Sequence, residues 1–508
     1  MLKDKDSMAI PLFNSIASWF LKKRIHQIEL FIKYPNEVQQ EVLQDLLGFA
    51  KKTKIGYQHD FSSIRQYSEF ARRVPIVTYE DIAAEITAGR QGEDNILWPT
   101  PIKWYAKSSG TTNAKSKYIP VSVEALEDCH YKAGKDMLSL YINNNPEAQL
   151  FNGKTLRLGG SQELYQNERN AFGDLSAIMT DNLPFWAELN CTPSLKVSLM
   201  SEWGAKMQAI IAESSQENVT GLMGVPSWML VLLHKLLEQH PGKELKDIWP
   251  NIEVYFHGGV SFRPYRSQYE KLLKDHSLQF YEIYNASEGF FAIQDRNNSE
   301  DLLLMLDYGI FYEFIPLGED DSAIIPLDQV QLGKRYTLVI TTNGGLWRYK
   351  IGDVLQFTSL SPYRIQIAGR TKHYINAFGE ELVVDNADRA ISLASLACGV
   401  EVVDYTVAPI FMEGNKKGSH EWMIEFEIAP WDLTKFQSVL DQELKSLNSD
   451  YEAKRYKDMT MVLPKINVAK EGLFYRWLEH KKKLGGQHKV PRLSNDRKLI
   501  NSLLEMNV

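Results

Sequence analysis

The feature that most constrains this chain is an alternation of short apolar strands with helices between Pro101 and Arg370. The strands end in glycine-rich turns, and a helix is predicted over residues 225–238 with Pro226 in its first turn. Three segments carry the strand pattern: 252–256, 280–284 and 336–341. Strands that alternate with helices predict a largely α/β architecture.

The pattern changes after Arg370. Residues 422–428 alternate as a strand does, an apolar helical stripe follows over 433–447, and a short strand is predicted over 460–463. This β-α-β order predicts a small α+β domain at the C-terminal end of the chain.

Two domains follow from this change of pattern. We expect a large N-terminal domain of β-sheets flanked by helices over residues 1–378, and a small domain over 379–508. The first part of the large domain is predicted to be helical, with Asn36 as the cap of a helix over 38–50. Residues 8–20 resemble a signal-peptide core but lack a cleavage site, so we interpret them as an amphipathic helix. No apolar run is long enough to span a membrane.

Composition narrows the class of protein. Of the 508 residues, 44% are hydrophobic, which excludes a disordered chain. The net charge of −7 argues against a dedicated nucleic-acid binder, and no membrane partner is expected. The three cysteines, Cys129, Cys191 and Cys398, are too far apart in sequence for a CxxC metal pair, and they predict a reducing, cytoplasmic location.

The strongest local signal is a polar loop over residues 108–117, which reads SSGTTNAKSK. Such a turn can direct backbone N–H groups and hydroxyls at phosphate oxygens while a lysine supplies positive charge. The spacing is not that of a Walker loop. A polar surface loop without a ligand is the alternative interpretation.

Two further motifs follow apolar strands. Residues 284–289 read YNASEG, and a carboxylate such as Glu288 at that point can hold Mg²⁺ beside phosphates, while Tyr284 can stack on a base. Residues 349–353 read YKIGD, and Asp353 after a glycine turn can accept hydrogen bonds from both ribose hydroxyls. Taken singly, an ordinary strand end or turn explains each motif as well.

The last two motifs lie near the domain boundary and near the C-terminus. Gly369-Arg370-Thr371-Lys372 leads into residues 376–381, NAFGEE, which predicts either a hinge or an ordinary linker. Residues 485–492 read GGQHKVPR and follow three lysines at 481–483. This basic segment is interpreted either as a solvated face or as a mobile loop that brings Lys489 into an active site. No aromatic residues alternate with it, which argues against nucleic-acid binding.

In chain order the motifs are SSGTT…K, a strand that ends in HGG, YNASEG, YKIGD and GR…N…G. This series resembles that of the acyl-adenylate-forming superfamily. Within it the chain is most similar to the auxin-responsive Gretchen Hagen family of acyl-acid amido synthetases. The segments VPIVTYED at 74–81 and GQHKVPR at 486–492 point the same way. The resemblance extends from about residue 15 to residue 495.

The resemblance implies a large adenylate-forming domain, a small mobile domain and a role for each motif. Its implied catalytic residues are Lys489, which would reach the α-phosphate when the small domain rotates in, Glu288, which would bind Mg²⁺, and Lys117. The remaining implied contacts with ATP are Ser108, Ser109, Gly110, Thr111 and Thr112 for the phosphates, Gly258 and Gly259 for the adenine, Tyr284 for the base, Ser287 for the α-phosphate region, and Asp353 for the ribose.

Two departures from the family pattern stand out. Plant members usually have glycines where this polar loop has Asn113 and Ala114. They also carry a lysine after the linker strand, where this chain reads Gly379-Glu380-Glu381. The second departure leaves the positive charge at the α-phosphate to Lys489.

The resemblance implies a reaction in two steps, with ATP and Mg²⁺ as cofactors. A small carboxylic acid attacks the α-phosphate of ATP and forms an acyl-adenylate, and the acyl group then passes to the amine of an amino acid. Positioning and charge neutralisation do most of the work in such a reaction. Transfer to the thiol of coenzyme A and a catalytically silent nucleotide-binding protein are the alternatives.

The acyl pocket is less clearly marked in the sequence. Trp228, Phe290 and Phe291 flank the motifs and are candidates to bind the acyl substrate, with core packing as the alternative for each. Gly159-Gly160-Ser161 follows a predicted strand and is a candidate border of the same cavity.

Overall fold

The structure is a computed structural model. It describes residues 23–109, 116–159, 165–166, 169–183, 185–200, 203–260, 262, 265–274, 277–370, 374–414, 416–481 and 490–507. Within these ranges, no helix combines the length and the apolar character needed to cross a bilayer. The helix predicted over residues 8–20 lies outside the described residues.

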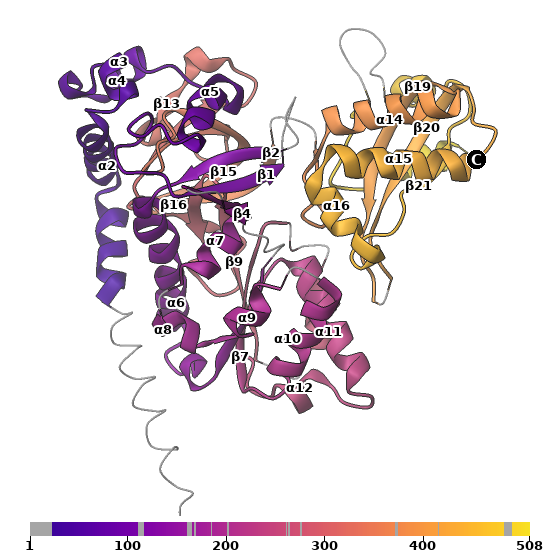
Figure 1. Cartoon of the computed structure of the whole chain (residues 1–508), viewed down its shortest axis with the longest axis horizontal. Coiled ribbons are helices and arrows are strands. Elements are labelled where there is room, and N and C mark those ends of the chain that lie inside the picture. The colour runs from indigo at the N-terminus through magenta and orange to yellow at the C-terminus, as the bar shows by residue number, and fades with distance from the viewer. Residues whose placement is uncertain are drawn as a thin grey trace, which may run out of the picture.

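A mixed sheet of twelve strands forms the centre of the larger part of the molecule (Figure 1). Neighbouring strands from β9 through β8, β7 and β3 to β6 are parallel, and the rest of the sheet is antiparallel. In sheet order the strands are β13 (Ile325–Pro326), β12 (Ile310–Pro316), β14 (Arg335–Thr342), β15 (Tyr349–Leu360), β16 (Tyr363–Arg370), β11 (Leu302–Leu304), β10 (Gly289–Ile293), β9 (Gln279–Ala286), β8 (Val254–Gly258), β7 (Val219–Gly224), β3 (Lys154–Leu158) and β6 (Cys191–Thr192).

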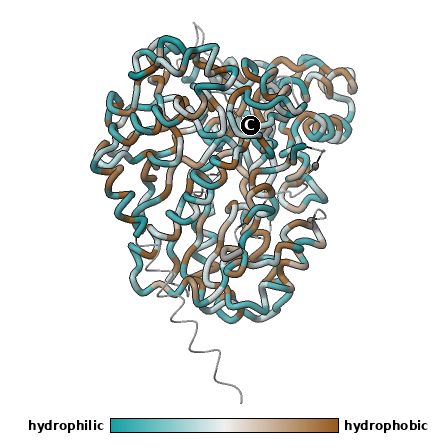
Figure 2. The backbone as a smooth tube through the Cα atoms, turned by 60° about the vertical axis from the view of Figure 1, so that its left-hand side comes forward, coloured by the Kyte–Doolittle hydropathy of each residue, from teal (hydrophilic) through white to brown (hydrophobic). Residues whose placement is uncertain are grey.

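In the described residues, a second sheet, the helical residues 23–33 and the helices α2 to α13 complete this part. The second sheet has the order β2 (Ser116–Val121), β1 (Trp104–Ser109), β5 (Ala171–Gly173), β4 (Tyr165–Gln166). The helices are α2 (Pro35–Ala50), α3 (Lys54–Gln58), α4 (Tyr67–Arg73), α5 (Tyr79–Arg90), α6 (Lys132–Asn144), α7 (Leu175–Asp181), α8 (Phe185–Leu189), α9 (Leu195–Ser198), α10 (Trp203–Ser214), α11 (Pro226–Gln239), α12 (Leu245–Ile248) and α13 (Arg266–Leu272). The backbone of the outer helices alternates between hydrophilic and hydrophobic residues, as expected for helices that cover a core (Figure 2).

The C-terminal unit, which we define as residues 374–507, has its own sheet and helices and lies to the right of the large sheet in Figure 1. Its sheet has the order β19-β20-β21, with β19 and β20 antiparallel and β20 and β21 parallel. Its elements are β17 (Tyr374–Ile375), β18 (Leu382–Val383), α14 (Val384–Cys398), β19 (Glu401–Ile410), β20 (Ser419–Ile428), α15 (Leu433–Leu447), α16 (Ser449–Arg455), β21 (Lys465–Val468), α17 (Leu473–His480) and α18 (Lys498–Met506).

The predicted α/β architecture, with its smaller C-terminal part, is confirmed, and two local predictions need correction. The helix predicted to be capped by Asn36 begins at Pro35, because proline fits the first helical turn and Tyr34 takes the cap position. The third C-terminal strand lies at Lys465–Val468 and not at 460–463, because only the later segment pairs with β20. The domain boundary proposed at 378/379 falls inside the loop between β17 and β18 and stays a prediction.

The segment before β15 is held by a buried ion pair. Arg348 and Glu313 are 3% and 0% exposed, and the Arg348 guanidinium lies 2.8 Å from the Glu313 carboxylate. The same guanidinium donates to the carbonyls of Ala71 and Val74, which end helix α4. This pair therefore joins the N-terminal helices to the strand that carries Asp353.

We expect Arg348→Met to lower the apparent free energy of unfolding by about 3–5 kcal/mol, because it leaves the buried Glu313 carboxylate without its cation. Denaturant titration measures this change. Lys154→Met, which breaks the partly exposed pair with Glu217, is the control and should cost at most about 1 kcal/mol. Equal losses in both variants would contradict a structural role for the buried pair.

Candidate functional site

A cavity of about 1040 Å³ opens between the large sheet and the C-terminal unit. Its walls come from segments that are far apart in the sequence. Among the predicted site residues that the structure describes, the following line it: Lys117, Gly259, Tyr284, Ser287, Glu288 and Asp353. The fold therefore brings the YNASEG and YKIGD motifs, the HGG turn and one lysine of the polar loop to the same cavity.

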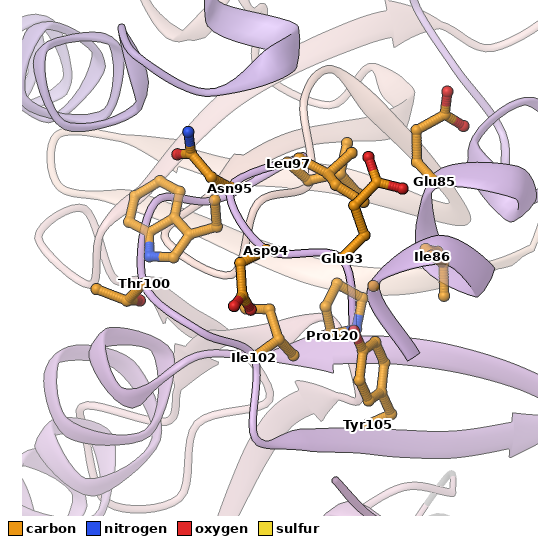
Figure 3. A pocket seen from close by; sticks show the side chains of 13 residues that line it. Glu85, Ile86, Glu93, Asp94, Asn95, Leu97, Thr100, Ile102, Tyr105 and Pro120 are labelled. Carbon is orange, nitrogen blue, oxygen red and sulfur yellow. The ribbon is translucent and has the colours of Figure 1, made fainter. Parts of the chain in front are cut away.

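A much smaller cavity, of about 30 Å³, lies beside helix α5 (Figure 3). Glu85, Glu93 and Asp94 line it, and in Figure 3 their carboxylates point in different directions. A space of this size holds one or two water molecules. None of the predicted site residues borders it, so it is not the candidate site.

Tyr284 and Asp353 lie together in the wall of the larger cavity. The Tyr284 hydroxyl donates a 2.6 Å hydrogen bond to Oδ2 of Asp353, and both residues are 5% exposed. Tyr284 lies on β9 and packs on Phe291, with ring centroids 4.9 Å apart. The YKIGD motif was expected to be a turn, but it is part of strand β15, and this extended backbone brings Asp353 to Tyr284.

Three glycines lie near Tyr284 and Asp353: Gly258, Gly259 and Gly352. A Cβ atom on Gly258 would lie 2.5 Å from the carbonyl oxygen of Ile283, so a side chain does not fit there. Gly259 and Gly352 have φ angles of +82° and +92°, in the left-handed region that favours glycine. Gly259, which is exposed and lines the cavity, leaves its backbone open to a flat ligand, whereas the space beside Gly258 is filled by strand β9.

Ser287 and Glu288 form the two-residue turn of the hairpin between β9 and β10. Both are half-buried and line the cavity. The hairpin fixes the position of Glu288 because Gly289 pairs with Ala286 directly beyond the turn. The motif thus ends in a turn that holds a carboxylate at the cavity wall.

The predicted phosphate loop connects two antiparallel strands, β1 and β2. Ser108 and Ser109 lie at the end of β1, and Ser108 is paired with Lys117 on β2. Gly110, Thr111 and Thr112 lie outside the described residues, as do Asn113 and Ala114. Lys117 lines the cavity, and its Nζ lies 5.6 Å from the ring centroid of Tyr79.

The segment around Tyr79 had no role assigned from the sequence. Thr78, Tyr79 and Glu80 line the cavity, and the backbone N–H of Tyr118 donates to the Tyr79 hydroxyl. Val77 is bonded to the backbone on either side of Tyr349, which fastens this segment to β15. The VPIVTYED motif thus supports both Lys117 and the strand of Asp353.

His257 is a cavity residue that sequence reasoning treated only as part of the HGG turn. Burial, with the positive charge of Arg266 as a smaller cause, lowers the pKa of His257 to about 3. The ring is therefore neutral near pH 7. It stacks on Phe262 with ring centroids 4.0 Å apart, which makes this side of the cavity aromatic.

The three candidates for the acyl pocket lie in the core. Trp228, Phe290 and Phe291 are at most 6% exposed, and none is among the residues that line the larger cavity. Phe290 packs on Tyr308, and the Trp228 indole N–H donates to the carbonyl of Phe378. Of the predicted border at 159–161, only Gly159 is described.

Lys489 and its neighbours at 482–488 lie outside the described residues. The chain that follows this segment returns to the cavity, because residues 493–497 line it. Val407 donates to the backbone of Arg492 and is paired with Leu493, which fixes the segment on β19. The position of Lys489 itself stays a prediction.

Among the described residues, no group of three or more His, Cys, Asp and Glu side chains is arranged to hold a metal ion. Mg²⁺ in nucleotide sites is commonly held by one or two carboxylates together with phosphate oxygens and water. A single carboxylate at Glu288, half-buried in a turn at the cavity wall, fits that donor set.

Three family models match the chain in order. The GH3 family N-terminal domain matches residues 24–278, the GH3 family central domain 303–370, and the GH3 family C-terminal domain 385–498. These matches confirm the family predicted from the motif series.

Relatives and solved structures agree with the family models. The indole-3-acetic acid-amido synthetase GH3.4 of Arabidopsis thaliana is 24% identical over 94% of this chain and 93% of its own length. The jasmonoyl–L-amino acid synthetase JAR4 of Nicotiana attenuata is 24% identical over 95% of this chain and 96% of its own. The structure of the GH3.15 acyl acid amido synthetase has the same fold, with a TM-score of 0.60, 19% identity and 96% coverage of each chain.

Proposed function

The chain belongs to the GH3 family, and on that premise we propose that it is an ATP-dependent, AMP-forming ligase that adenylates a carboxylic acid and transfers the acyl group to the amine of an amino acid. One observation carries the proposal. Tyr284, Asp353, Glu288 and Lys117, which come from different segments, line a single cavity. Two of the similar proteins join acids to amino acids, an indole-3-acetic acid-amido synthetase and a jasmonoyl–L-amino acid synthetase.

We assign the nucleotide to the end of the cavity around Asp353. The turn at Gly258 and Gly259 would lie along the adenine, with Gly259 at the cavity wall, and Tyr284 would contact the adenine while its hydroxyl orients Asp353. The oriented carboxylate would accept hydrogen bonds from the ribose hydroxyls. Ser287 and the polar loop at 108–112 would meet the phosphates.

The first step needs charge neutralisation at the phosphates. Lys117, and Lys489 from the C-terminal unit, would each place one positive charge beside the phosphate chain. Glu288 would hold Mg²⁺, which when bound shields the negative charge of the phosphate oxygens. The acid's carboxylate oxygen attacks the α-phosphate, the bond to the β-phosphate bridging oxygen breaks, and pyrophosphate leaves. In the second step the amine attacks the acyl carbon, and AMP leaves.

We further propose that residues 379–508 act as a mobile unit that excludes water from the adenylate. A contact of the acyl substrate with Trp228, Phe290 and Phe291 stays a proposal from the sequence, since Trp228 packs in one hydrophobic cluster and the two phenylalanines in another. The three cysteines carry no disulfide, and we propose a cytoplasmic location for the reaction.

ATP–pyrophosphate exchange over a panel of carboxylic acids tests the first step, and mass spectrometry with pooled amino acids tests the second. Exchange with at least one acid and an amide product support the proposal. A thioester with coenzyme A and no amide would instead establish the thiol acceptor. Binding of ATP without exchange for any acid would indicate a silent nucleotide-binding protein.

Tyr284→Phe removes the hydroxyl that orients Asp353. We expect KM for ATP to rise about 10- to 100-fold, because a hydrogen bond to a charged group contributes about 1.5–3 kcal/mol. The double variant Tyr284→Phe with Asp353→Asn should lose less than the sum of the single losses, because the residues act as one unit. Tyr336→Phe, which removes a buried hydroxyl away from the cavity, is the control. Additive losses would show that Tyr284 acts independently of Asp353.

A further inference from the structure

The loop between β17 and β18, residues 376–381, lies at the start of the C-terminal unit, where this unit contacts the large part of the molecule, and we call it the linker loop. Two of its carbonyl groups are held by side chains of the large part. The Tyr265 hydroxyl donates to the carbonyl of Ala377 at 2.5 Å, and the Trp228 indole N–H donates to that of Phe378 at 3.1 Å. All four residues are buried.

The amide groups of the same two residues are held from the other side. The N–H of Ala377 donates to Oε1 of Glu380 at 3.1 Å, and the N–H of Phe378 donates to Oε2 at 2.6 Å. His420 on β20 lies 2.8 Å from Oε1 through its Nε2. Glu380 and His420 are both 0% exposed, so these contacts replace the water that a carboxylate needs.

The hydrogen-bond pattern assigns the tautomer of His420. Its Nδ1 is buried and has no hydrogen-bond partner among the described residues. A neutral ring with its proton on Nε2 donates to Glu380 and leaves only a lone pair unsatisfied, whereas a charged ring would bury a second N–H without an acceptor. Glu380 therefore accepts from three donors, two of the loop and one of the C-terminal unit.

Phe378 contacts the C-terminal unit through its ring and the large part through its carbonyl group. Its ring is buried beside His420, with centroids 6.4 Å apart, and it lies where a Cβ atom on Gly418 would have to be. Its carbonyl meanwhile belongs to the contact with Trp228. Movement of the C-terminal unit must either carry this carbonyl away from Trp228 or deform the loop.

A lysine of the C-terminal unit also contacts Trp228 of the large part. Nζ of Lys454, on helix α16, lies 4.0 Å from the ring centroid of Trp228. A Cβ atom on Gly379 would lie 3.0 Å from Cε of Lys454, so the bare glycine gives the lysine its path. Gly379 and Glu381 have φ angles of +90° and +39°. A positive φ is common for glycine but uncommon for glutamate, so a loop without contacts would not favour this backbone shape at Glu381.

The linker loop is also part of the cavity wall. Asn376, Ala377 and Glu381 line the cavity, and the Asn376 side chain donates to the carbonyl of Gly259 at 3.0 Å. The shape of the loop thus decides where the C-terminal unit meets the end of the cavity assigned to the nucleotide.

We propose that Glu380 and His420 are positioning residues: they hold the linker loop in the shape that Tyr265 and Trp228 bind, and so fix the orientation of the C-terminal unit over the cavity. Of the two glutamates that stand in place of the family's hinge lysine, Glu380 thus has a structural task here as the acceptor that orders the loop. Only the effect on rates rests on the proposed function.

Distances between the large part and the C-terminal unit test whether the linker loop fixes their relative orientation, and this test needs no substrate. Spin labels at Glu319→Cys and Lys435→Cys, both exposed positions, report the separation in a chain with Cys191→Ser and Cys398→Ser. We expect a single narrow distance distribution in this reference protein. Glu380→Ala should at least double its width, and His420→Gln, which keeps a donor, should have a smaller effect.

The two half-reactions test the consequence for catalysis. In Glu380→Ala, the ratio of amide formation to ATP–pyrophosphate exchange should change more than threefold. Trp228→Phe, which removes the indole N–H but keeps an aromatic ring, should broaden the distances in the same way. It keeps the proposal testable if Glu380→Ala does not fold.

Asp441→Asn is the matched control. Asp441 is a buried carboxylate of the C-terminal unit that binds Arg455 and Tyr451 but does not touch the linker loop. This variant should lose stability while the distance distribution and the ratio of half-reactions stay as in the reference. An unchanged distribution in both Glu380→Ala and Trp228→Phe overturns the proposal. A broadened distribution with a ratio within threefold of the reference also overturns it, because the residues would then not position the reaction.

Discussion

Glu288→Ala is expected to reduce ATP–pyrophosphate exchange about 10³-fold, which corresponds to about 4 kcal/mol of transition-state stabilisation. The carboxylate lies in a fixed two-residue turn at the cavity wall, and it is the group we assign to the metal that shields the phosphates. The fold should remain intact, because a half-buried turn residue contributes little to the core.

Two measurements separate this effect from a general loss of structure. Circular dichroism and the unfolding midpoint should match those of the unmodified protein. Glu85→Gln, a change at the small cavity beside α5, should leave exchange unchanged. Exchange at the normal rate in Glu288→Ala would remove the metal role from this residue.

Lys489→Ala is expected to slow adenylate formation about 10²-fold while KM for ATP stays within about threefold of its normal value. A lysine that meets the α-phosphate mainly as charge develops there acts on the transition state more than on binding. Single-turnover measurement of adenylate formation, together with ATP binding by calorimetry, gives both quantities.

Lys481→Ala is the matched control for that variant. Lys481 is an exposed lysine at the end of α17, shortly before the glycine-rich segment, and its removal should change neither quantity. An unchanged rate of adenylate formation in Lys489→Ala would place Lys489 outside the site and leave Lys117 as the principal cation.

The sequence predicted the elements whose patterns are local. The strand before HGG, the strand before YNASEG and helix α11 lie within one or two residues of their expected bounds, since apolar runs and glycine turns mark them directly. The strand expected at 460–463 was misplaced, because pairing with β20, and not the apolar run, decides which residues become β21. YKIGD was expected to be a turn because its glycine is a local turn signal. In the structure it is part of strand β15, because it pairs with β14 on one side and β16 on the other.

In the candidate site, too, local motifs were predictable from the sequence, whereas contacts between distant segments were not. Motif order was sufficient to select Glu288, Asp353 and Lys117, which line one cavity, because each motif is a contiguous stretch of sequence; their roles stay predictions. The support of Lys117 by Tyr79 and the neutral state of His257 were not foreseen, since burial and distant charges determine both.

By itself, then, the sequence determined the family, the α/β class and which residue types could serve ATP chemistry, because those depend on short motifs in a fixed order. The tertiary structure decided which side chains meet. The Tyr284 hydroxyl reaches Asp353 across 69 residues, and Trp228 reaches the carbonyl of Phe378 across 150. Such contacts depend on sheet register and on the docking of the C-terminal unit, which no local pattern encodes. For that reason Trp228, a candidate for the acyl pocket by sequence, lies at the linker loop, and Glu380 finds its partner in His420.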